Sequence, residues 1–246
     1  MNKNERINEI NENLRLIERT DGLVFGTDAY LLSAFLPKRS TLIGAELGAG
    51  TGVISLLALS KNKCKHVYGI EIQEDFSRLS ERNAELNGFS DRFTIINKNV
   101  NDCTCVDTFK EVDFVFSNPP YMKVSSGKAN ENDEKNIARH EVCANIYDFC
   151  ACAKRILKHG GNFYIVYRPD RMIDLISALR NNNFEPKKII FIHPNSTTPP
   201  SLILVSAKLG AKSGLIIPKP VFIYKDGTTE YTEEYENIYK NCSLEL

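Results

Sequence analysis

The alternation of short apolar runs with amphipathic stretches constrains the fold of this chain more than any other feature of its sequence. Amphipathic segments predict helices over 52–61, 75–87 and 144–158, and glycines close the last two at Gly88 and Gly160-Gly161. Strands that alternate with helices usually pair in one direction, so the pattern predicts an α/β fold: a seven-stranded, mostly parallel sheet with helices on both faces. The runs that predict its strands are 42–47, 66–72, 93–98, 112–117, 162–167, 188–193 and 201–207.

The length of 246 residues suits one large α/β domain, which we place over residues 1–246. Residues 1–26 are predicted to be an N-terminal extension with a hairpin turning at Asp21-Gly22. Residues 221–246 are predicted to be a C-terminal appendage with an Asp-Gly turn at 226–227 and a helix capped by Thr232. A long polar segment, 119–143, interrupts the alternation, and loops of such length are usually functional or mobile.

The composition excludes several classes of protein. No apolar run reaches the roughly 18–20 residues that span a bilayer, and the polar N-terminus lacks the apolar core of a signal peptide. We therefore expect a soluble cytoplasmic protein with no membrane partner and no evident obligate protein partner. The seven cysteines are odd in number, which favours buried reduced thiols. The pairs Cys103/Cys105 and Cys150/Cys152 lack the usual metal-site spacing, so we predict no metal.

Charge is distributed unevenly although the formal net charge is zero. Residues 151–220 hold eleven lysines and arginines against three acidic residues, a net charge of +8, whereas residues 221–246 carry −4. Ordinary solvated surface would account for this excess. The alternative is a basic face for an anionic partner, with Arg168, Arg171, Lys187 and Lys188 as candidate phosphate contacts.

A glycine-rich segment, Glu46-Leu47-Gly48-Ala49-Gly50-Thr51-Gly52, follows the first predicted strand and opens a helix. Glycines permit tight turns and close approach of the backbone to a ligand. A helix N-terminus favours an anion, whereas Glu46 favours an ammonium, so a zwitterionic amino-acid group would satisfy both. The segment matches neither the dinucleotide fingerprint nor the phosphate loop. A plain turn between strand and helix is the alternative interpretation.

Glu71 ends the next predicted strand. A carboxylate at that place accepts hydrogen bonds from both hydroxyls of a ribose in dinucleotide-binding folds. A solvated strand end is the alternative for Glu71 taken by itself. The glycine-rich turn and Glu71 together favour binding of a nucleoside.

A third motif, Ser117-Asn118-Pro119-Pro120-Tyr121, follows the strand predicted at 112–117. Two prolines fix an extended turn and remove two backbone donors, which leaves carbonyl acceptors beside the Asn118 side-chain oxygen. An aromatic ring follows at once. Such a site would hold a flat substrate that carries an –NH₂ group. A rigid turn with a packed tyrosine is the alternative.

These motifs occur in an order that resembles the class I S-adenosylmethionine-dependent methyltransferases acting on amino groups, over residues 25–210. The segments 25–29 (FGTDA), 138–141 (ARHE) and 167–169 (YRP) make the chain similar to the bacterial tRNA1(Val) adenine N6-methyltransferase family, which modifies the adenine 3′ of the anticodon. The resemblance implies a Rossmann-like sheet whose last strand is antiparallel. It also implies S-adenosylmethionine as methyl donor, S-adenosylhomocysteine as product, and N6 of adenine in RNA, preferably tRNA, as target.

The resemblance implies a role for each matching residue. Asn118 and Pro119 would hold the target amino group, Pro120 would fix the turn, and Tyr121 would stack on the target base. Asn99 stands where related enzymes usually carry Asp, and its amide oxygen can still accept a hydrogen bond from the cofactor's adenine. Thr27 and Asp28 would border the cofactor pocket, or begin a helix as caps, or do both. The remaining cofactor-binding candidates are Glu46, Gly48, Gly50, Gly52, Glu71, Ile72 and Val100.

The loop that follows the proline turn is either a substrate lid or a plain surface loop. Its candidate RNA contacts are Lys123, Arg139 and His140, and the role of the His140-Glu141 pair stays open because a packed histidine is the alternative. The same core also methylates protein glutamine, ribosomal RNA guanine and DNA adenine, each of which presents a planar –NH₂. A non-catalytic cofactor-binding module that binds RNA is the remaining alternative.

Overall fold

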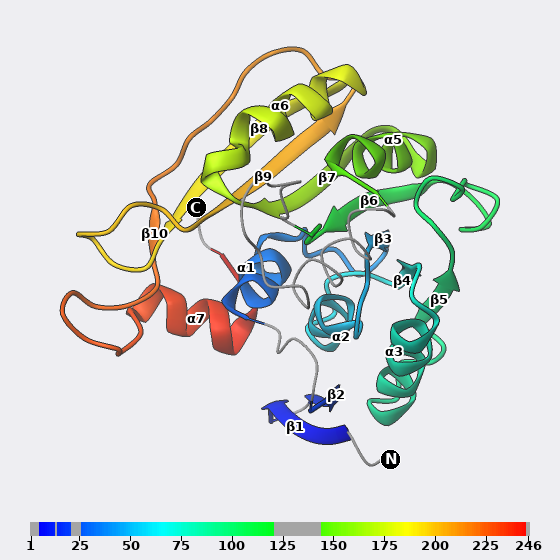
Figure 1. Cartoon of the computed structure of the whole chain (residues 1–246), viewed down its shortest axis with the longest axis horizontal. Helices are drawn as coiled ribbons and strands as arrows, with labels where there is room; N and C mark the ends of the chain where they lie inside the picture. Colours follow the sequence, from blue (N-terminus) through cyan, green and yellow to red (C-terminus); the bar gives the residue numbers. More distant parts are fainter. Residues whose placement is uncertain (1–4, 13, 21–25, 121–143, 245–246) are drawn as a thin grey trace, which may run out of the picture.

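One large sheet forms the centre of the described structure. The structure is a computed structural model and describes residues 5–12, 14–20, 26–120 and 144–244. In this part of the chain eight strands form the sheet, in the spatial order β10-β8-β9-β7-β6-β3-β4-β5 (Figure 1). They are β3 (Ile43–Leu47), β4 (His66–Glu71), β5 (Phe93–Asn97), β6 (Val112–Ser117), β7 (Leu157–Tyr167), β8 (Phe184–His193), β9 (Leu202–Leu209) and β10 (Val221–Phe222).

The direction of the strands confirms the predicted α/β class. β9 is antiparallel to both of its neighbours, β7 and β8, and the other neighbouring pairs of this sheet are parallel. All seven predicted strands are present, and the last of them, β9, is the antiparallel one. The count of seven was too low because β10 adds an eighth strand beside β8. A strand of two residues is too short to show a periodicity in the sequence.

Helices cover both faces of the sheet and enclose two separate cores. In Figure 1, α5 and α6 lie over one face, whereas α1 and α2 lie over the other. Side chains of β6 alternate between the two cores: Phe114 and Phe116 belong to the first, with α1 and α2, and Val115 belongs to the second, with α5 and α6. The helices are α1 (Thr27–Phe35), α2 (Val53–Ser60), α3 (Glu74–Leu86), α5 (Ile146–Ile156), α6 (Met172–Asn181) and α7 (Glu233–Asn241), with a 3₁₀ turn at Pro169–Arg171.

The junction of α5 and β7 differs from the sequence expectation. The helix was predicted to reach Lys158, but it ends at Ile156, and Leu157 already pairs with Val112 of β6. Gly160-Gly161 therefore lies inside β7 and does not end the helix. A Cβ at Gly161 would come within 2.7 Å of the Leu157 side chain and 3.0 Å of the Asp113 carbonyl oxygen. This close packing explains a glycine in the strand.

The N-terminal hairpin consists of β1 (Glu5–Asn11) and β2 (Leu14–Arg19), which pair antiparallel. Its turn lies between Asn11 and Leu14, upstream of the predicted turn at Asp21-Gly22, which falls outside the described residues. Asn83 of α3 holds β2 in place, because its side chain accepts from the Ile17 amide at 2.7 Å and donates to the Ile17 carbonyl at 3.1 Å. Tertiary contacts with α3 thus fix the hairpin.

The segment predicted as a C-terminal appendage packs into the domain. Val221, Tyr235 and Ile238 are buried in the same core as α1 and α2, and the rings of Tyr239 and Tyr30 lie 4.6 Å apart. Thr232 caps α7 as its sequence predicts, since its hydroxyl accepts from the Tyr235 amide at 3.1 Å. Within the described ranges, no helix combines the length and the apolarity needed to cross a membrane, and no three potential metal ligands gather.

Candidate functional site

The carboxyl ends of three neighbouring parallel strands bring the predicted motifs together. β3 lies between β4 and β6, with Leu47 paired to Ile70 and Glu46 paired to Phe116. The glycine-rich segment, Glu71 and Asn118 each follow one of these strand ends, so they meet at one edge of the sheet. We call residues 46–52, 71–73 and 117–119 the glycine-loop edge. Ligands of open α/β sheets bind outside the carboxyl ends of the strands, where this edge lies.

The glycine loop has a backbone that other residues adopt at a cost. Gly48, Gly50 and Gly52 have φ angles of +73°, +54° and +80°, in the left-handed region. A Cβ at Gly52 would contact Ser80 Oγ and come within 2.7 Å of the Phe93 ring, whereas a Cβ at Gly50 would meet no described heavy atom within 4 Å. Gly52 thus allows close packing beneath the loop. Gly50 borders open space that a ligand can occupy.

Glu46 is buried beneath this loop and is 1% exposed. Its Oε2 accepts hydrogen bonds from the Ser55 backbone amide at 3.2 Å and from the Ser55 hydroxyl. Ser55 lies in the first turn of α2, so the carboxylate satisfies an amide that the helix itself leaves without a partner. Burial, with a smaller contribution from the nearby Glu71 carboxylate, raises the pKa of Glu46 to about 8.

Glu71 connects the end of β4 to the glycine loop. Its Oε2 accepts from the Gly50 amide at 2.8 Å, and its Oε1 accepts from the Gln73 amide at 2.9 Å. The amide group of Asn97, at the end of β5, donates to the carbonyls of Glu71 and Ile72 at 2.8 and 3.1 Å. Ile72 is 40% exposed beside this carboxylate, which gives this cofactor-binding candidate an accessible apolar surface.

Asn118 follows β6 at the same edge, and two hydrogen bonds fix its surroundings. The hydroxyl of Ser117 donates to the Leu47 carbonyl at 2.7 Å, which ties the proline turn to the start of the glycine loop. The Asn118 side-chain Nδ2 donates to Oδ2 of Asp28 at 2.6 Å. Pro119 is buried and Pro120 is exposed, while Tyr121 falls outside the described residues.

Thr27 and Asp28 occupy the first turn of α1, so the expectation that they begin a helix is correct, although Gly26 is the residue at the cap position. Asp28 has its Oδ1 at 3.0 Å from the Ala29 amide and its Oδ2 on Asn118. The resemblance placed Asp28 beside the cofactor. The structure also places it against the residue predicted to hold the substrate, a contact that a separation of 90 residues in the sequence conceals.

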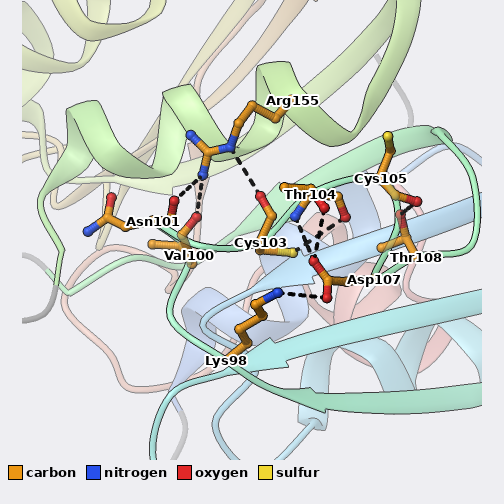
Figure 2. A network of polar contacts seen from close by, with 9 residues as sticks. All are labelled: Lys98, Val100, Asn101, Cys103, Thr104, Cys105, Asp107, Thr108 and Arg155. Carbon is orange, nitrogen blue, oxygen red and sulfur yellow. Dashed lines mark hydrogen bonds and ion pairs between the residues drawn. The ribbon is translucent and has the colours of Figure 1, made fainter.

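Asn99 and Val100 lie in the turn that follows β5, next to the glycine-loop edge. Asn99 Oδ1 accepts from the Asn101 amide at 2.9 Å, and the Val100 side chain is buried. Arg155 of α5 fixes this turn, since its guanidinium donates to the carbonyls of Val100, Asn101 and Cys103 at 2.5, 3.1 and 3.1 Å (Figure 2). The sequence contains no signal for this contact, because Arg155 and Val100 are 55 residues apart.

The predicted RNA contacts do not form one group. Arg168 and Arg171 follow β7, which is parallel to β6 and ends at the same edge of the sheet as Asn118. Each is paired with an acidic side chain, Asp170 at 3.0 Å and Asp174 at 2.8 Å. Lys187 and Lys188 lie instead in the first half of β8, farther from this edge. Lys123, Arg139 and His140 fall outside the described residues.

Comparisons with known proteins find methyltransferases. The model of the family described as methyltransferase small domain matches residues 21–182. The tRNA1(Val) (adenine(37)-N6)-methyltransferase of Dyadobacter fermentans is 24% identical over 82% of this chain and 83% of its own length. The protein of the same name from Parabacteroides distasonis is 25% identical over 90% of this chain and 91% of its own length.

Solved structures show the same fold. A predicted O-methyltransferase of Agrobacterium tumefaciens superposes with a TM-score of 0.72 and 21% identity over 89% of this chain and 98% of that one. The tRNA m1G37 methyltransferase of M. jannaschii gives a TM-score of 0.59 and 17% identity over 86% of this chain and 59% of that one. At these identities the superpositions describe the fold and leave the substrate open.

Proposed function

This chain belongs to the methyltransferase small domain family of S-adenosylmethionine-dependent enzymes, and we propose that it methylates the exocyclic N6 of adenine in RNA, with an adenosine of the tRNA anticodon loop as its target. The observation that carries the proposal is the Asn118-Pro119 turn, placed by β6 beside the glycine loop that β3 positions. Relatives named for this reaction at tRNA1(Val), matched over most of both chains, support the choice of target.

The glycine-loop edge has the features that the cofactor requires. Two acidic side chains, Glu46 and Glu71, are buried at this edge. Burial raises the pKa of Glu46 to about 8, so the carboxylate of Glu71 is the group that favours a ligand with positive charge. Open space above Gly50 admits the ligand, and Ile72 offers an exposed apolar side chain near Glu71. We assign the ribose hydroxyls to Glu71, the adenine to Ile72 and the turn at Asn99, and the amino-acid part to the glycine loop. Glu46 would act on that part from beneath the loop.

For methyl transfer, the main task of the protein is to align the target amino group with the methyl donor. The cofactor, when bound, supplies an electrophilic methyl group on a sulfonium centre. The adenine amino nitrogen is a poor nucleophile because its lone pair is delocalised into the ring. The Asn118 side-chain oxygen and the carbonyl of Pro119 would accept hydrogen bonds from its two N–H groups, which orients the nitrogen and favours a pyramidal geometry. Alignment of reactants of this kind contributes on the order of 7–11 kcal/mol.

An RNA loop suits this site better than a duplex. The target base must leave its stack to reach an acceptor pair at the edge of a sheet, and this costs least in a single-stranded loop. Arg168 and Arg171 follow β7 at the same edge, and we assign to them contacts with the phosphates that flank such a base. Phosphate contacts make binding fall steeply as salt rises.

The test is methyl transfer from labelled S-adenosylmethionine to RNA, DNA and protein fractions of a strain that lacks this gene. We expect label in tRNA, recovered as N6-methyladenosine after digestion to nucleosides. Asn118→Ala should lower the rate at least about a hundredfold, the size of effect seen when a key polar group of a reaction centre is removed. Asn182→Ala is the matched control, because Asn182 is a half-buried residue whose side chain donates to the Ala178 carbonyl at the C-terminus of α6.

Three outcomes would contradict the proposal. Label in protein would move the target to an amide such as that of glutamine, and label in ribosomal RNA guanine would move it to another base, with the fold and the cofactor unaffected. An Asn118→Ala variant that keeps full activity would remove the acceptor role of this turn, whichever fraction carries the label.

A further inference from the structure

The contact between Asn118 and Asp28 determines the orientation of an amide group. A side-chain amide has a donor face and an acceptor face of nearly equal size, and a rotation of about 180° exchanges them. An ionised carboxylate only accepts hydrogen bonds, so a carboxylate partner selects the rotamer in which Nδ2 faces it. The 2.6 Å bond from Asn118 Nδ2 to Asp28 Oδ2 is charge-assisted and belongs to the stronger class of hydrogen bonds.

Asp28 is itself held firmly. Its Oδ1 lies 3.0 Å from the Ala29 amide in the first turn of α1, where the helix dipole favours a negative charge. A Cβ at Gly26 would lie 3.1 Å from this oxygen, so the glycine leaves room for the carboxylate. The other end of α1 is fixed by the Lys63 ammonium, which donates to the carbonyls of Ser33, Ala34 and Leu36.

The opposite face of the amide therefore has a defined direction. With Nδ2 on Asp28, Oδ1 of Asn118 is turned away from Asp28, and the backbone that carries it is tied through Ser117 to the glycine loop. A target –NH₂ is a donor and needs an acceptor. The opposite rotamer would present one donor to another, and no hydrogen bond would form.

We propose that Asp28 is a positioning residue of the methyl transfer, which acts by holding the Asn118 amide with its oxygen toward the amino group of the substrate. The inference rests on the proposed function, because it assumes that the target presents –NH₂ to Asn118. Asp28 lies on α1, which precedes β3, β4 and β5 in the sequence. The site would therefore join a helix N-terminus to a strand end across 90 residues of sequence.

The first test separates turnover from cofactor binding. Asp28→Ala should lower kcat about tenfold to a hundredfold, the cost of a lost polar contact in the reacting geometry. The dissociation constant of S-adenosylmethionine, measured by calorimetry, should change less than about threefold. Asp91→Asn is the control, since Asp91 is exposed and precedes β5 at the opposite edge of the sheet. If cofactor affinity falls as far as kcat does, Asp28 belongs to the cofactor pocket and the inference is wrong.

The second test exchanges the two groups. Asn118→Asp places two carboxylates against each other and should be as inactive as Asn118→Ala. The double variant Asp28→Asn/Asn118→Asp restores one donor facing one carboxylate, with an acceptor again turned outward. It should be at least about tenfold more active than Asn118→Asp. A double variant no better than Asn118→Asp would overturn the inference, because a purely structural role predicts that the two losses add.

The third test does not depend on activity. In the ¹⁵N-labelled protein, the side-chain NH₂ resonance of Asn118, assigned by its loss in Asn118→Ala, should show one proton shifted downfield by the charge-assisted bond. Asp28→Ala should remove this shift, and Asp91→Asn should leave it unchanged. If the bond is seen but Asp28→Ala keeps full kcat while Asn118→Ala is inactive, the inference fails and the proposed function stands. An active Asn118→Ala would refute the function itself.

Discussion

The sequence draws attention both to the glycine-loop edge and to the basic segment 151–220, but the fold gathers the residues of the two regions differently. At the glycine-loop edge, residues far apart in sequence converge because each follows the carboxyl end of a parallel strand. In the basic segment, the three acidic residues each pair with an arginine: Asp170 with Arg168, Asp174 with Arg171, and Glu185 with Arg180. Position relative to a strand end predicts where a side chain lies, whereas a charge count does not predict a shared face.

Arg155 shows the difference most clearly. It contributes to the +8 net charge of the basic segment, but its guanidinium donates to three carbonyls in the turn after β5 (Figure 2). It thus helps to build the glycine-loop side of the molecule, where it acts through hydrogen bonds to the backbone. Substitutions in the two regions should therefore differ in their cost, and the glycine loop should be the most sensitive.

Gly52→Ala should be the most damaging change at the glycine-loop edge. The left-handed backbone costs about 1–2 kcal/mol for alanine, and the new Cβ would push against Ser80 and the Phe93 ring, which adds about 1–3 kcal/mol of overpacking. We expect urea denaturation to show a loss of about 3 kcal/mol in the free energy of unfolding. Gly50→Ala, where φ is +54° and space is open, should lose only about 1–2 kcal/mol. Equal losses would contradict this account of the loop.

Glu46 should give the unfolding free energy a pH dependence. Its pKa is about 8 in the folded protein because of burial, above its usual value of 4.5, so the folded chain binds more protons than the unfolded chain between about pH 4.5 and 8. The free energy of unfolding should therefore fall as pH rises through this window, by up to about 1.4 kcal/mol per pH unit. Glu46→Gln, which keeps an acceptor for the Ser55 amide, should flatten the profile. Glu85→Gln, on the exposed side of α3, should leave it as in the parent protein.

Arg155→Ala should destabilise the protein by about 1–2 kcal/mol, because three carbonyls lose a charged donor at a partly exposed place. It should also weaken S-adenosylmethionine binding, since the turn that it holds carries Asn99. Arg180→Ala breaks a surface pair with Glu185 and should cost less than about 0.5 kcal/mol, with cofactor binding unchanged. Equal losses of stability and of cofactor affinity in the two variants would contradict the role of Arg155 in holding the turn after β5.

Arg168→Ala should have the smallest effect on stability, less than about 0.5 kcal/mol, because its ion pair with Asp170 is exposed. Filter binding of tRNA should nevertheless weaken, with the slope of log affinity against log salt reduced by about one. Lys188→Ala, in the first half of β8, should change RNA binding less. A larger effect at Lys188 would place the RNA on a face of the basic segment away from Asn118.

Much of the fold follows from sequence patterns with a local cause. The seven apolar runs are all strands, the helix-capping Thr232 is in place, and the left-handed φ angles of the glycine loop are those that glycine allows at low cost. The errors arise where the cause is not local. The two residues of β10 carry no pattern, and Leu157 pairs with β6 where the amphipathic pattern continued the helix. The hairpin of β1 and β2 is likewise held from a distance, by Asn83 of α3.

The candidate site divides in the same way. Sequence patterns are enough to identify the three motifs and their positions at strand ends, and parallel pairing then requires that they meet, since strands of one direction end at one edge. The partners of each side chain depend on the folded domain: Ser55 for Glu46, Gly50 for Glu71, and Asp28 for Asn118. A hydrogen bond requires two atoms within about 3 Å with suitable geometry, and packing across the whole domain sets such distances.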